Sequence, residues 1–338
     1  MEKGMDDNAL CPLRVGLTYN LKHNTVSEVE DEEAEYDSED TVYAIKKALE
    51  KENCQVTLLE ATEDLPSKLK EFRPDIVFNI AEGIGGRGRE AQVPAILNMF
   101  RIPFTGSDET TLCIALDKAL TKRILTTYHI KTPKYQVISK NHAKLNPSVK
   151  FPVIVKPNAE GSSKGISDGA VVSNQEELNN LIEANMNLYK EDMLVEEYIE
   201  GREFTVGILG NGDELKVFPP MEIVFHNRKS KLNIYSYNVK KNYKEYVSYE
   251  CPAKLDKETE AKMMRTARKV YEALNCVDFA RVDFRMSEDG QIYFIEINPL
   301  PGLAPGYSDY PMIAEFNGVK YEDLVRAIFR NALKRYGL

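Results

Sequence analysis

The sequence lacks the cysteine pattern of a disulfide-stabilised or zinc-binding protein. Its five cysteines are scattered and odd in number, and no two are spaced as C-x-x-C. Such a set offers neither a disulfide framework nor the paired thiolates of a structural zinc site. We therefore expect reduced thiols and a cytoplasmic location.

The sequence also lacks a long apolar segment and an excess of basic residues. The opening segment MEKGMDDNALCP has no apolar signal-peptide core, and no run of about 18 consecutive apolar residues follows. A net charge of −9 disfavours a nucleic-acid partner, because such partners need a basic surface. With 43% hydrophobic and 29% charged residues, the 338 residues predict a soluble protein of two or three packed units and no membrane span.

The N-terminal part of the chain alternates between strand and helix patterns. Apolar strands are predicted over 13–18, 55–59 and 75–80, with an amphipathic helix after Asp40 that Ser38 or Asp40 can cap. This alternation predicts a parallel sheet with right-handed crossovers, which binds ligands at the carboxyl ends of its strands. Nine of the thirteen residues over 28–40 are acidic, a run that is expected to be solvated and mobile.

A glycine-rich segment, AEGIGGRGRE, follows the third predicted strand directly. Its four glycines in ten residues indicate a ligand-facing loop, but their spacing does not fit the G-x-G-x-x-G of dinucleotide-binding units. Glu82 in this loop, with Asp37 and Glu39 from the acidic run, is predicted to lie at the ligand-facing end of the sheet. These carboxylates can anchor a substrate ammonium group. The alternative for Asp37 and Glu39 is that they only cap and charge the start of the helix.

A second loop, EGSSKG at 160–165, follows a strand over 153–156 and precedes a short strand over 169–172. Its backbone N–H groups and hydroxyls can meet phosphate oxygens, and Lys156 at the strand end is a phosphate-facing cation. The pattern predicts a hairpin flap that closes over a nucleotide. A flexible linker is the alternative.

A C-terminal hairpin over 277–302 gathers acids on one face. Alternating apolar and charged residues predict a strand that includes 281–286, a turn at 287–290 and a return strand over 291–297. Pairing of Met286 with Gln291 would set Arg281 opposite Glu296.

With that register, Asp283 lies one diagonal step from Glu296, and Asn298 continues the same face. Two carboxylates and an amide oxygen suit a hard cation such as Mg²⁺. The alternative is a cross-strand salt bridge between Arg281 and Glu296 on a solvated face.

The hairpin sequence RVDF…IYFIEINPLPG resembles the metal-binding signature of ATP-grasp ligases, and the order of motifs is most similar to the D-alanine–D-alanine ligase group. The resemblance runs from about Val15 to the C-terminus and includes IPFTGS at 102–107, which matches the family's P-[YF]-T-G-S link. It implies an α/β and α+β protein with an ATP-grasp fold and an N-terminal Rossmann-like parallel-sheet domain, the pre-ATP-grasp domain. The expected units are 1–107 for substrate binding, 108–195 for the small ATP-grasp subdomain with the flap, and 196–338 for the metal site and a lid at 225–247.

The resemblance also assigns roles to individual residues. The metal ligands are Asp283, Glu296 and Asn298, holding Mg²⁺ as two ions, with Mn²⁺ as an alternative. The ATP contacts are Lys118, Lys156, Ser163, Glu196, Tyr198, Ile199, Glu203, Lys240 and Phe294. The substrate contacts are Arg281, Gly302, Tyr307 and Ser308, and the position at the edge of the sheet, not the resemblance, adds Glu82, Asp37 and Glu39. The catalytic residues are Arg281, Ser162 and Lys240.

The activity implied by the resemblance is ATP-dependent carboxylate–amine ligation through an acyl phosphate, with release of ADP and phosphate. Four departures from the family pattern lie at the substrate end: the Gly-Gly-x-Ser-x-Glu opening is absent, and Glu82, Lys241 and Tyr307 replace a histidine, a tyrosine and a serine. We therefore expect two amino acids, or an amino acid and a small carboxylic acid, as substrates.

Two alternatives stay open. One is D-alanine–D-alanine ligation for peptidoglycan precursors, and the other is a non-catalytic nucleotide-binding regulator. Retention of Lys156 with Asp283, Glu296 and Asn298 argues against the regulator, and the resemblance also implies a possible homodimer. The basic, tyrosine-rich stretch over 225–247 could bind single-stranded nucleic acid, but the acidic net charge favours a lid.

Overall fold

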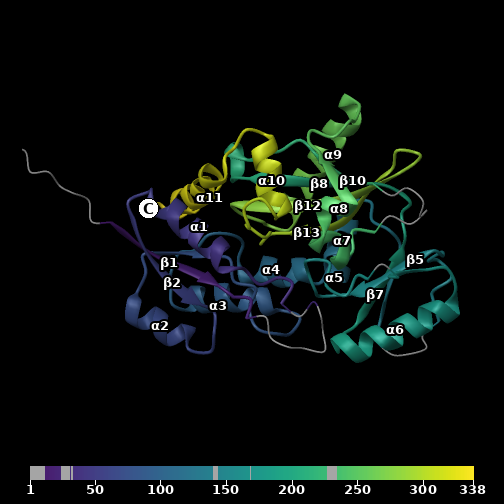
Figure 1. Cartoon of the computed structure of the whole chain (residues 1–338), viewed down its shortest axis with the longest axis horizontal. Coiled ribbons are helices and arrows are strands. Elements are labelled where there is room, and N and C mark those ends of the chain that lie inside the picture. Colours follow the sequence, from purple (N-terminus) through teal and green to yellow (C-terminus); the bar gives the residue numbers. More distant parts are fainter. Residues whose placement is uncertain (1–11, 24–30, 32, 140–143, 168, 227–233) are drawn as a thin grey trace, which may run out of the picture.

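The computed structural model describes residues 12–23, 31, 33–139, 144–167, 169–226 and 234–338. Within these residues the strands form three sheets, which lie along the long axis of the molecule with helices packed around them (Figure 1). No helix in the described part of the chain has the length and apolar character needed to cross a membrane.

The N-terminal sheet is parallel, as the sequence predicts, and has the strand order β2-β1-β3. Its elements are β1 (Leu13–Tyr19), α1 (Glu39–Glu50), β2 (Cys54–Glu60), α2 (Leu65–Phe72), β3 (Ile76–Asn79), the 3-10 helix η1 (Arg89–Ala91) and α3 (Gln92–Met99). Ser38 caps α1, since its hydroxyl accepts a hydrogen bond from the Thr41 amide. The segment before α1 and the glycine-rich loop after β3 therefore meet at the carboxyl edge of this sheet.

The second sheet is antiparallel, with the order β4-β7-β5-β6. It contains β4 (Tyr135–Ile138), β5 (Val153–Pro157), β6 (Val171–Val172) and β7 (Met193–Glu197), and the helices nearby in sequence are α4 (Glu109–Leu116), α5 (Lys118–Thr127) and α6 (Gln175–Tyr189). Val153 pairs with Val172 and Ile154 with Val171, which confirms the hairpin predicted around the second glycine-rich loop.

The third sheet has the order β11-β10-β8-β12-β13, with β9 added beside β8. Its elements are β8 (Gly201–Leu209), η2 (Gly212–Glu214), β9 (Lys216–Val217), β10 (Met221–Phe225), α7 (Tyr237–Lys241), α8 (Tyr243–Tyr246), β11 (Val247–Glu250), α9 (Lys257–Ala273), β12 (Phe279–Ser287), β13 (Ile292–Asn298) and α10 (Asp309–Phe316). The predicted lid over 225–247 is thus partly helical, and its residues 227–233 lie outside the described residues.

The predicted register of the C-terminal hairpin is wrong. Met286 pairs with Ile292 rather than Gln291, and the register shifts again between Asp283 and Phe284. A β-bulge of this kind adds one residue to one strand and cannot be read from the alternation of side chains. As a result Asp283, not Arg281, lies opposite Glu296.

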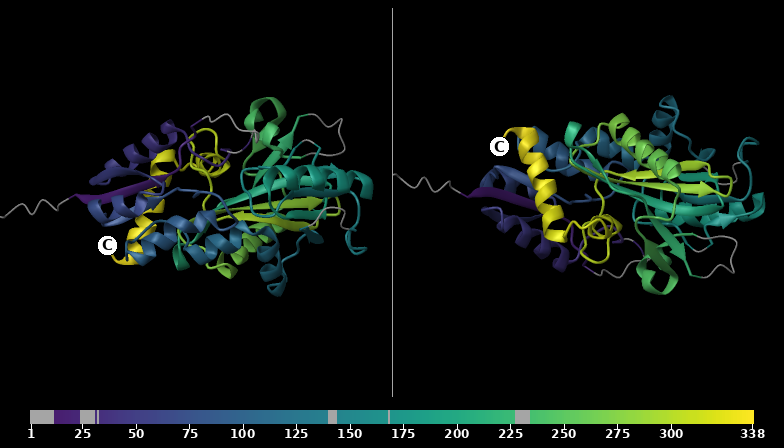
Figure 2. Two further views of the ribbon diagram at one scale, coloured as in Figure 1. Left: turned by 90° about the horizontal axis from the view of Figure 1, so that it is seen from below. Right: turned by 90° about the horizontal axis from the view of Figure 1, so that it is seen from above.

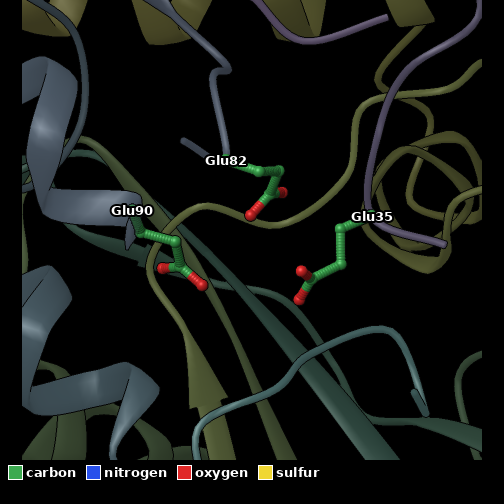
Figure 3. A group of neighbouring side chains, drawn as sticks. All are labelled: Glu35, Glu82 and Glu90. Carbon is green, nitrogen blue, oxygen red and sulfur yellow. The ribbon is translucent and has the colours of Figure 1, made fainter. Parts of the chain in front are cut away.

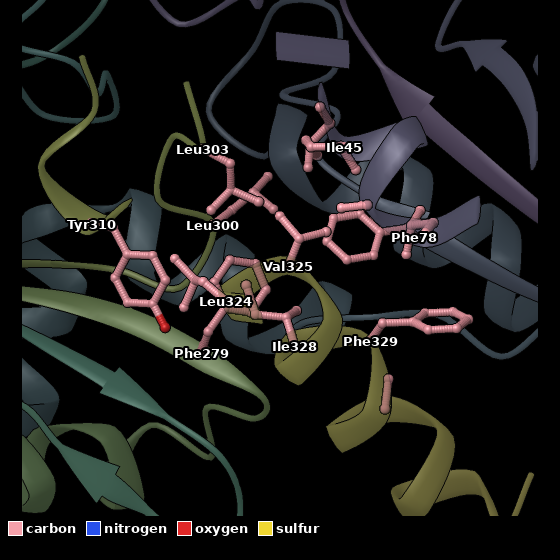
Figure 4. Packing of buried hydrophobic residues seen from close by; sticks show 14 of the residues in the cluster. Ile45, Phe78, Phe279, Leu300, Leu303, Tyr310, Leu324, Val325, Ile328 and Phe329 are labelled. Carbon is pink, nitrogen blue, oxygen red and sulfur yellow. The ribbon is translucent and has the colours of Figure 1, made fainter. Parts of the chain in front are cut away.

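The C-terminal end of the chain packs against the N-terminal sheet. Helix α11 (Tyr321–Tyr336) lies beside α1, and both views in Figure 2 show it against the N-terminal elements. Figure 4 shows Leu324, Val325 and Ile328 of α11 in one buried cluster with Ile45 and Phe78. The boundaries predicted at 107/108 and 195/196 stay predictions, and α11 completes the core of the first predicted unit.

Candidate active site

Two cavities meet beside the C-terminal hairpin. The first lies between the second and third sheets, under the flap that carries the EGSSKG loop, and the second extends toward the N-terminal sheet. Four residues line both cavities: Ser162, Lys240, Arg281 and Asp309. The three predicted catalytic residues are therefore brought together at the junction, and the Lys240 ammonium lies 3.4 Å from the Ser162 hydroxyl.

A buried charge cluster forms one wall of the first cavity. The Glu196 carboxylate lies 2.5 Å from the Lys156 ammonium and 3.0 Å from that of Lys122. Burial alone would raise the pKa of Glu196, but Lys122 and Lys156 lower it to about 2. Glu196 is thus ionised. Glu196 and Lys156, which are both predicted ATP contacts, line the cavity as an ion pair.

The opposite end of the first cavity is organised by an arginine that sequence reasoning missed. The Arg285 guanidinium contacts the Glu203 carboxylate at 2.9 Å, donates to the Ile199 carbonyl at 2.8 Å and lies 4.8 Å from the Tyr198 ring centroid. Burial raises the pKa of Glu203 to about 7. The sequence signal for Arg285 was its position on β12, two residues after Asp283, because alternate residues of a strand share a face.

Two predicted ATP contacts do not line this cavity. Phe294 is buried in the hydrophobic core against Phe284, and the cavity wall carries Phe284 and Ile295 instead. Lys118 is buried beyond the hairpin, where its ammonium lies 3.7 Å from the Glu296 carboxylate and donates to the Glu160 carbonyl. Lys118 thus links the C-terminal hairpin to the flap.

The hairpin face holds a ligand set that fits a hard cation. Asp283 pairs directly with Glu296 across the two strands, and Arg281 pairs with Asn298. The Asn298 amide nitrogen lies 3.3 Å from the Asp283 carboxylate, which Arg281 also contacts at 2.9 and 3.0 Å. Carboxylate and amide oxygens so gathered are of the kind that Mg²⁺ prefers, so the residues present fit this ion.

Electrostatics differ between the two acids of the hairpin. Burial raises the pKa of Asp283, with Arg281 opposing the effect. Burial would also raise the pKa of Glu296, but Lys118, Lys156 and Arg281 lower it below its ordinary value. Arg281 itself lies 3.6 Å from the buried Asp309, a partner that sequence reasoning did not find.

The second cavity has a volume of about 390 Å³ and joins the hairpin to the N-terminal sheet. Gly302, Tyr307 and Ser308 line it near Arg281, while Asp37 and Glu82 line its far end. A side chain at Gly302 would press on the Ser308 hydroxyl, at 2.8 Å from an added Cβ. Six of the seven predicted substrate contacts thus surround one cavity.

The exception is Glu39, which lies exposed in the first turn of α1 and does not line the cavity. Glu39 therefore does not join Asp37 and Glu82 in lining the cavity. The structure instead places Tyr237, one helical turn before Lys241, in the cavity lining.

Three carboxylates converge at the far end of the second cavity. Figure 3 shows Glu35, Glu82 and Glu90 pointing toward one another from three separate segments, and their ligand atoms lie within 4.8 Å of each other. Glu35 and Glu90 were not predicted as site residues. The available signal for Glu90 was its place at the end of the glycine-rich loop.

The acidic run is not wholly solvated, contrary to expectation. Glu35 accepts a hydrogen bond from the Gly161 amide at 2.6 Å and forms a salt bridge with buried Arg89. Asp31 is also buried and accepts from the Gly165 amide at 2.7 Å and from the Tyr189 hydroxyl. These partners compensate the two carboxylates for lost water, and they tie the flap to the N-terminal unit.

Comparison with known proteins agrees with this geometry. The family description "D-ala D-ala ligase C-terminus" matches residues 124–330. A D-alanine–D-alanine ligase of Aquifex aeolicus is 36% identical over 290 residues, which cover 84% of this chain and 92% of the relative. An uncharacterized protein of Sinorhizobium fredii, y4sG, is 31% identical, with 87% of each chain covered.

Among solved structures, a D-alanine–D-alanine ligase from Bacillus anthracis complexed with ATP has the same fold. It matches with a TM-score of 0.75 and 24% identity, covering 96% of this chain and 98% of the other. The fold and the relatives define an ATP-dependent carboxylate–amine ligase with the ATP-grasp architecture. The chain belongs to the D-alanine–D-alanine ligase family. The predicted fold class and family are thereby confirmed.

Proposed function

We propose that this protein joins two amino acids, or an amino acid and a small carboxylic acid, with ATP in the first cavity and the substrates in the second. The observation that supports it is the junction at which the two cavities share Ser162, Lys240, Arg281 and Asp309. At that junction the phosphate end of a nucleotide can meet a substrate carboxylate. The finer type proposed is a ligase of an acid and a D-amino acid.

The hairpin ligands Asp283, Glu296 and Asn298 are proposed to hold Mg²⁺, as two ions, with Mn²⁺ as an alternative. When bound, the metal neutralises charge on the phosphoryl group that is transferred. Lys156, Lys240 and the amides of the flap are proposed to face the phosphates. Tyr198, Ile199 and Glu203 line the other end of the first cavity and are proposed to face the nucleoside.

The reaction needs positioning more than it needs a reactive side chain. A substrate carboxylate oxygen takes the terminal phosphoryl group of ATP, and ADP leaves. An amine then attacks the acyl carbon, the amide bond forms, and phosphate leaves with the oxygen that carried it. Arg281 is proposed to donate to the oxyanion formed in the second step, and the loss of one such donor typically costs about 2.7–4 kcal/mol.

The substrate end carries the departures from the family pattern, and we propose that Glu82 and Asp37 attract a substrate ammonium group. D-Alanine as both substrates is the second candidate, favoured by the names of relatives such as the Aquifex aeolicus ligase. A homodimer, a cytoplasmic location and the absence of nucleic-acid and membrane partners stay predictions.

The experiment is a panel of amino acids offered singly and in pairs, with phosphate release and product mass as readouts. We expect phosphate release to depend on a specific pair and to match formation of a product with the summed mass less one water. Alanine as the sole effective substrate would favour the second candidate. ATP binding without turnover for any pair would instead favour a non-catalytic nucleotide-binding protein.

A further inference from the structure

Two carboxyl groups at the far end of the second cavity, those of Glu82 and Glu90, are not in direct contact with a basic group of the described residues. Within the part of the chain that the structure describes, no hydrogen bond or ion pair reaches the carboxylate of Glu82 or Glu90. Glu90 is only 9% exposed, and its side chain points into the shared space with Glu82 and Glu35 (Figure 3). A buried polar group without a partner calls for an explanation, because its desolvation is not compensated.

The neighbouring basic groups are already engaged. Arg89 contacts both Glu35, at 2.5 Å, and Glu160, at 3.1 Å. Lys164 lies 3.2 Å from Glu160, and Lys118 lies 3.7 Å from Glu296. Glu35 and Glu160 are therefore balanced by cations, while Glu82 and Glu90 are left as two acids that a cationic ligand can meet and ionise.

The electrostatics of the two acids agree with a site for a cation. Burial, together with Glu35 and Glu90, raises the pKa of Glu82 well above its ordinary value. Burial and Glu35 also raise the pKa of Glu90 to about 8, while Arg89 and Lys118 oppose the effect. Groups perturbed by burial and by like charge in a cleft are typical of functional sites.

The shape of the cavity favours an organic cation over a metal ion. Both oxygens of Glu35 are engaged, one by the Gly161 amide and the other by Arg89, so a three-carboxylate metal site lacks its third ligand. The cavity, at about 390 Å³, is far larger than one ion needs and continues to Arg281 and Gly302 at the reaction centre.

We infer that the ligand is an amino acid with two cationic groups, an α,ω-diamino acid, whose ammonium groups meet Glu82 and Glu90 while its carboxylate lies toward Arg281. This inference rests on the proposed function, since it places a substrate in the same cavity. It goes beyond the proposed function by naming the substrate class: a basic amino acid rather than alanine. A charge-assisted hydrogen bond to each carboxylate supplies the selectivity.

The test is direct binding in the absence of ATP and metal, measured by calorimetry on the full chain. Lysine, ornithine and 2,4-diaminobutyrate, each as the D and the L form, are compared with norleucine, norvaline and 2-aminobutyrate, which lack the terminal amine. At least one diamino acid should bind at least tenfold more tightly than its neutral counterpart. In the presence of ATP and a second substrate, the same preference should appear in kcat/KM.

Three variants make the test specific. Glu90→Gln and Glu82→Gln should each reduce the preference at least tenfold, and either one suffices if the other fails to fold. The matched control is Glu191→Gln, because Glu191 is a partly buried acid whose pKa is raised to about 7 but which lines neither cavity. The preference should be unchanged in this control.

Two outcomes overturn the inference. One is equal or tighter binding of the neutral amino acids. The other is binding of Mg²⁺ or Ca²⁺ alone, without nucleotide, that Glu90→Gln abolishes. Diamino acid binding without ATP turnover for any pair would uphold the inference about the cavity while contradicting the proposed reaction, so the two failures are distinguishable.

Discussion

Single residues in this site act mainly through charge. Asp283 and Glu296 face each other across the hairpin, with Arg281 on one side and Lys118 on the other. Like charges so close are tolerated in the folded protein because cations neutralise them. The hairpin therefore fits the proposed metal ion, and we expect the loss of either acid to lower activity more than it lowers stability.

Replacement of Glu296 by Gln tests this. We expect kcat to fall at least about 100-fold, because even groups behind metal ligands cost 10–100-fold when removed. The melting temperature should change little, since the shape of the side chain is kept. Steady-state phosphate release in saturating Mg²⁺ measures the effect, with Glu288→Gln, an exposed acid in the turn of the same hairpin, as the control. Equal turnover in the two variants would remove Glu296 from the metal site.

The predicted metal ligands lie on regular elements. Asp283, Glu296 and Asn298 follow from the alternation along two strands. Glu35 and Glu90 were not predicted, and they reach the cavity from a segment before a helix and from a short 3-10 helix. Side chains on such segments are positioned by tertiary contacts and have no sequence period.

Elements matter here through the flap. Its loop is held from outside by the acidic segment: Asp31 accepts from the Gly165 amide and Glu35 from the Gly161 amide. Gly165 has a φ of +74°, and an added Cβ would lie 2.3 Å from Pro157, so the turn is fixed by backbone geometry as well as by the carboxylate. Asp31 and Glu35 of the acidic run thus hold the predicted phosphate-binding loop in place; we call these two contacts the clamp.

Hydrogen exchange should reveal this clamp. Asp31→Ala removes a charged acceptor worth roughly 1.5–3 kcal/mol, so the Gly165 amide should exchange about ten- to a hundredfold faster. Tyr189→Phe is the control, because it removes only the tyrosine hydroxyl from the same carboxylate. It should leave the exchange rate at Gly165 close to that of the parent. If Asp31→Ala left this rate unchanged, the acidic segment would not hold the flap.

The sequence predicts the order of elements well, and the pairing between them less well. Parallel strands, the flap hairpin and the metal-site hairpin are all where the patterns place them. The predicted hairpin register is wrong because the turn already offsets the pairing by one residue, with Met286 opposite Ile292, and a bulge between Asp283 and Phe284 shifts it by one more. The acidic run was expected to be solvated, and this is wrong for Asp31 and Glu35 because their partners are distant in sequence. The Gly165 and Gly161 amides lie more than a hundred residues away, and Arg89 also pairs with Glu35.

At the scale of the whole molecule, the C-terminal helix packs against the N-terminal unit. Helix α11 packs on α1, and Arg335 near its end lies 2.8 Å from the fully buried Asp278, which also accepts from the Gly106 amide. No local sequence pattern predicts the packing of α11 on α1, because this packing depends on which apolar faces the other elements leave uncovered. The same packing buries acids such as Glu90 at the centre of the molecule, and burial raises their pKa.

Stability should therefore depend on pH in a definite direction. Folding raises the pKa of Glu90 to about 8, so near neutral pH the folded state binds more protons there than the unfolded state does. Unfolding free energy then falls as pH rises from about 5 to 8. Glu196 acts in the opposite sense, but its pKa of about 2 confines its effect to acidic solutions below about pH 4.5.

Thermal unfolding of the ligand-free protein between pH 5 and 8 measures this. We expect the melting temperature to fall across the range, and Glu90→Gln to flatten the fall while raising the value at pH 8. A melting temperature that rose with pH in the parent protein, or an unaltered slope in the variant, would show that Glu90 is not a buried, unpaired acid.

The most direct measurement of the central claim follows the oxygen atoms of the substrate. One amino acid is labelled with ¹⁸O in its carboxylate, and the phosphate released during ligation is analysed by mass spectrometry. Because phosphorylation and amine attack move a carboxylate oxygen to phosphate, each phosphate should carry one labelled oxygen when the labelled amino acid is the one activated. Coupled ligation that released unlabelled phosphate, whichever substrate bore the label, would contradict an acyl phosphate and with it the proposed reaction.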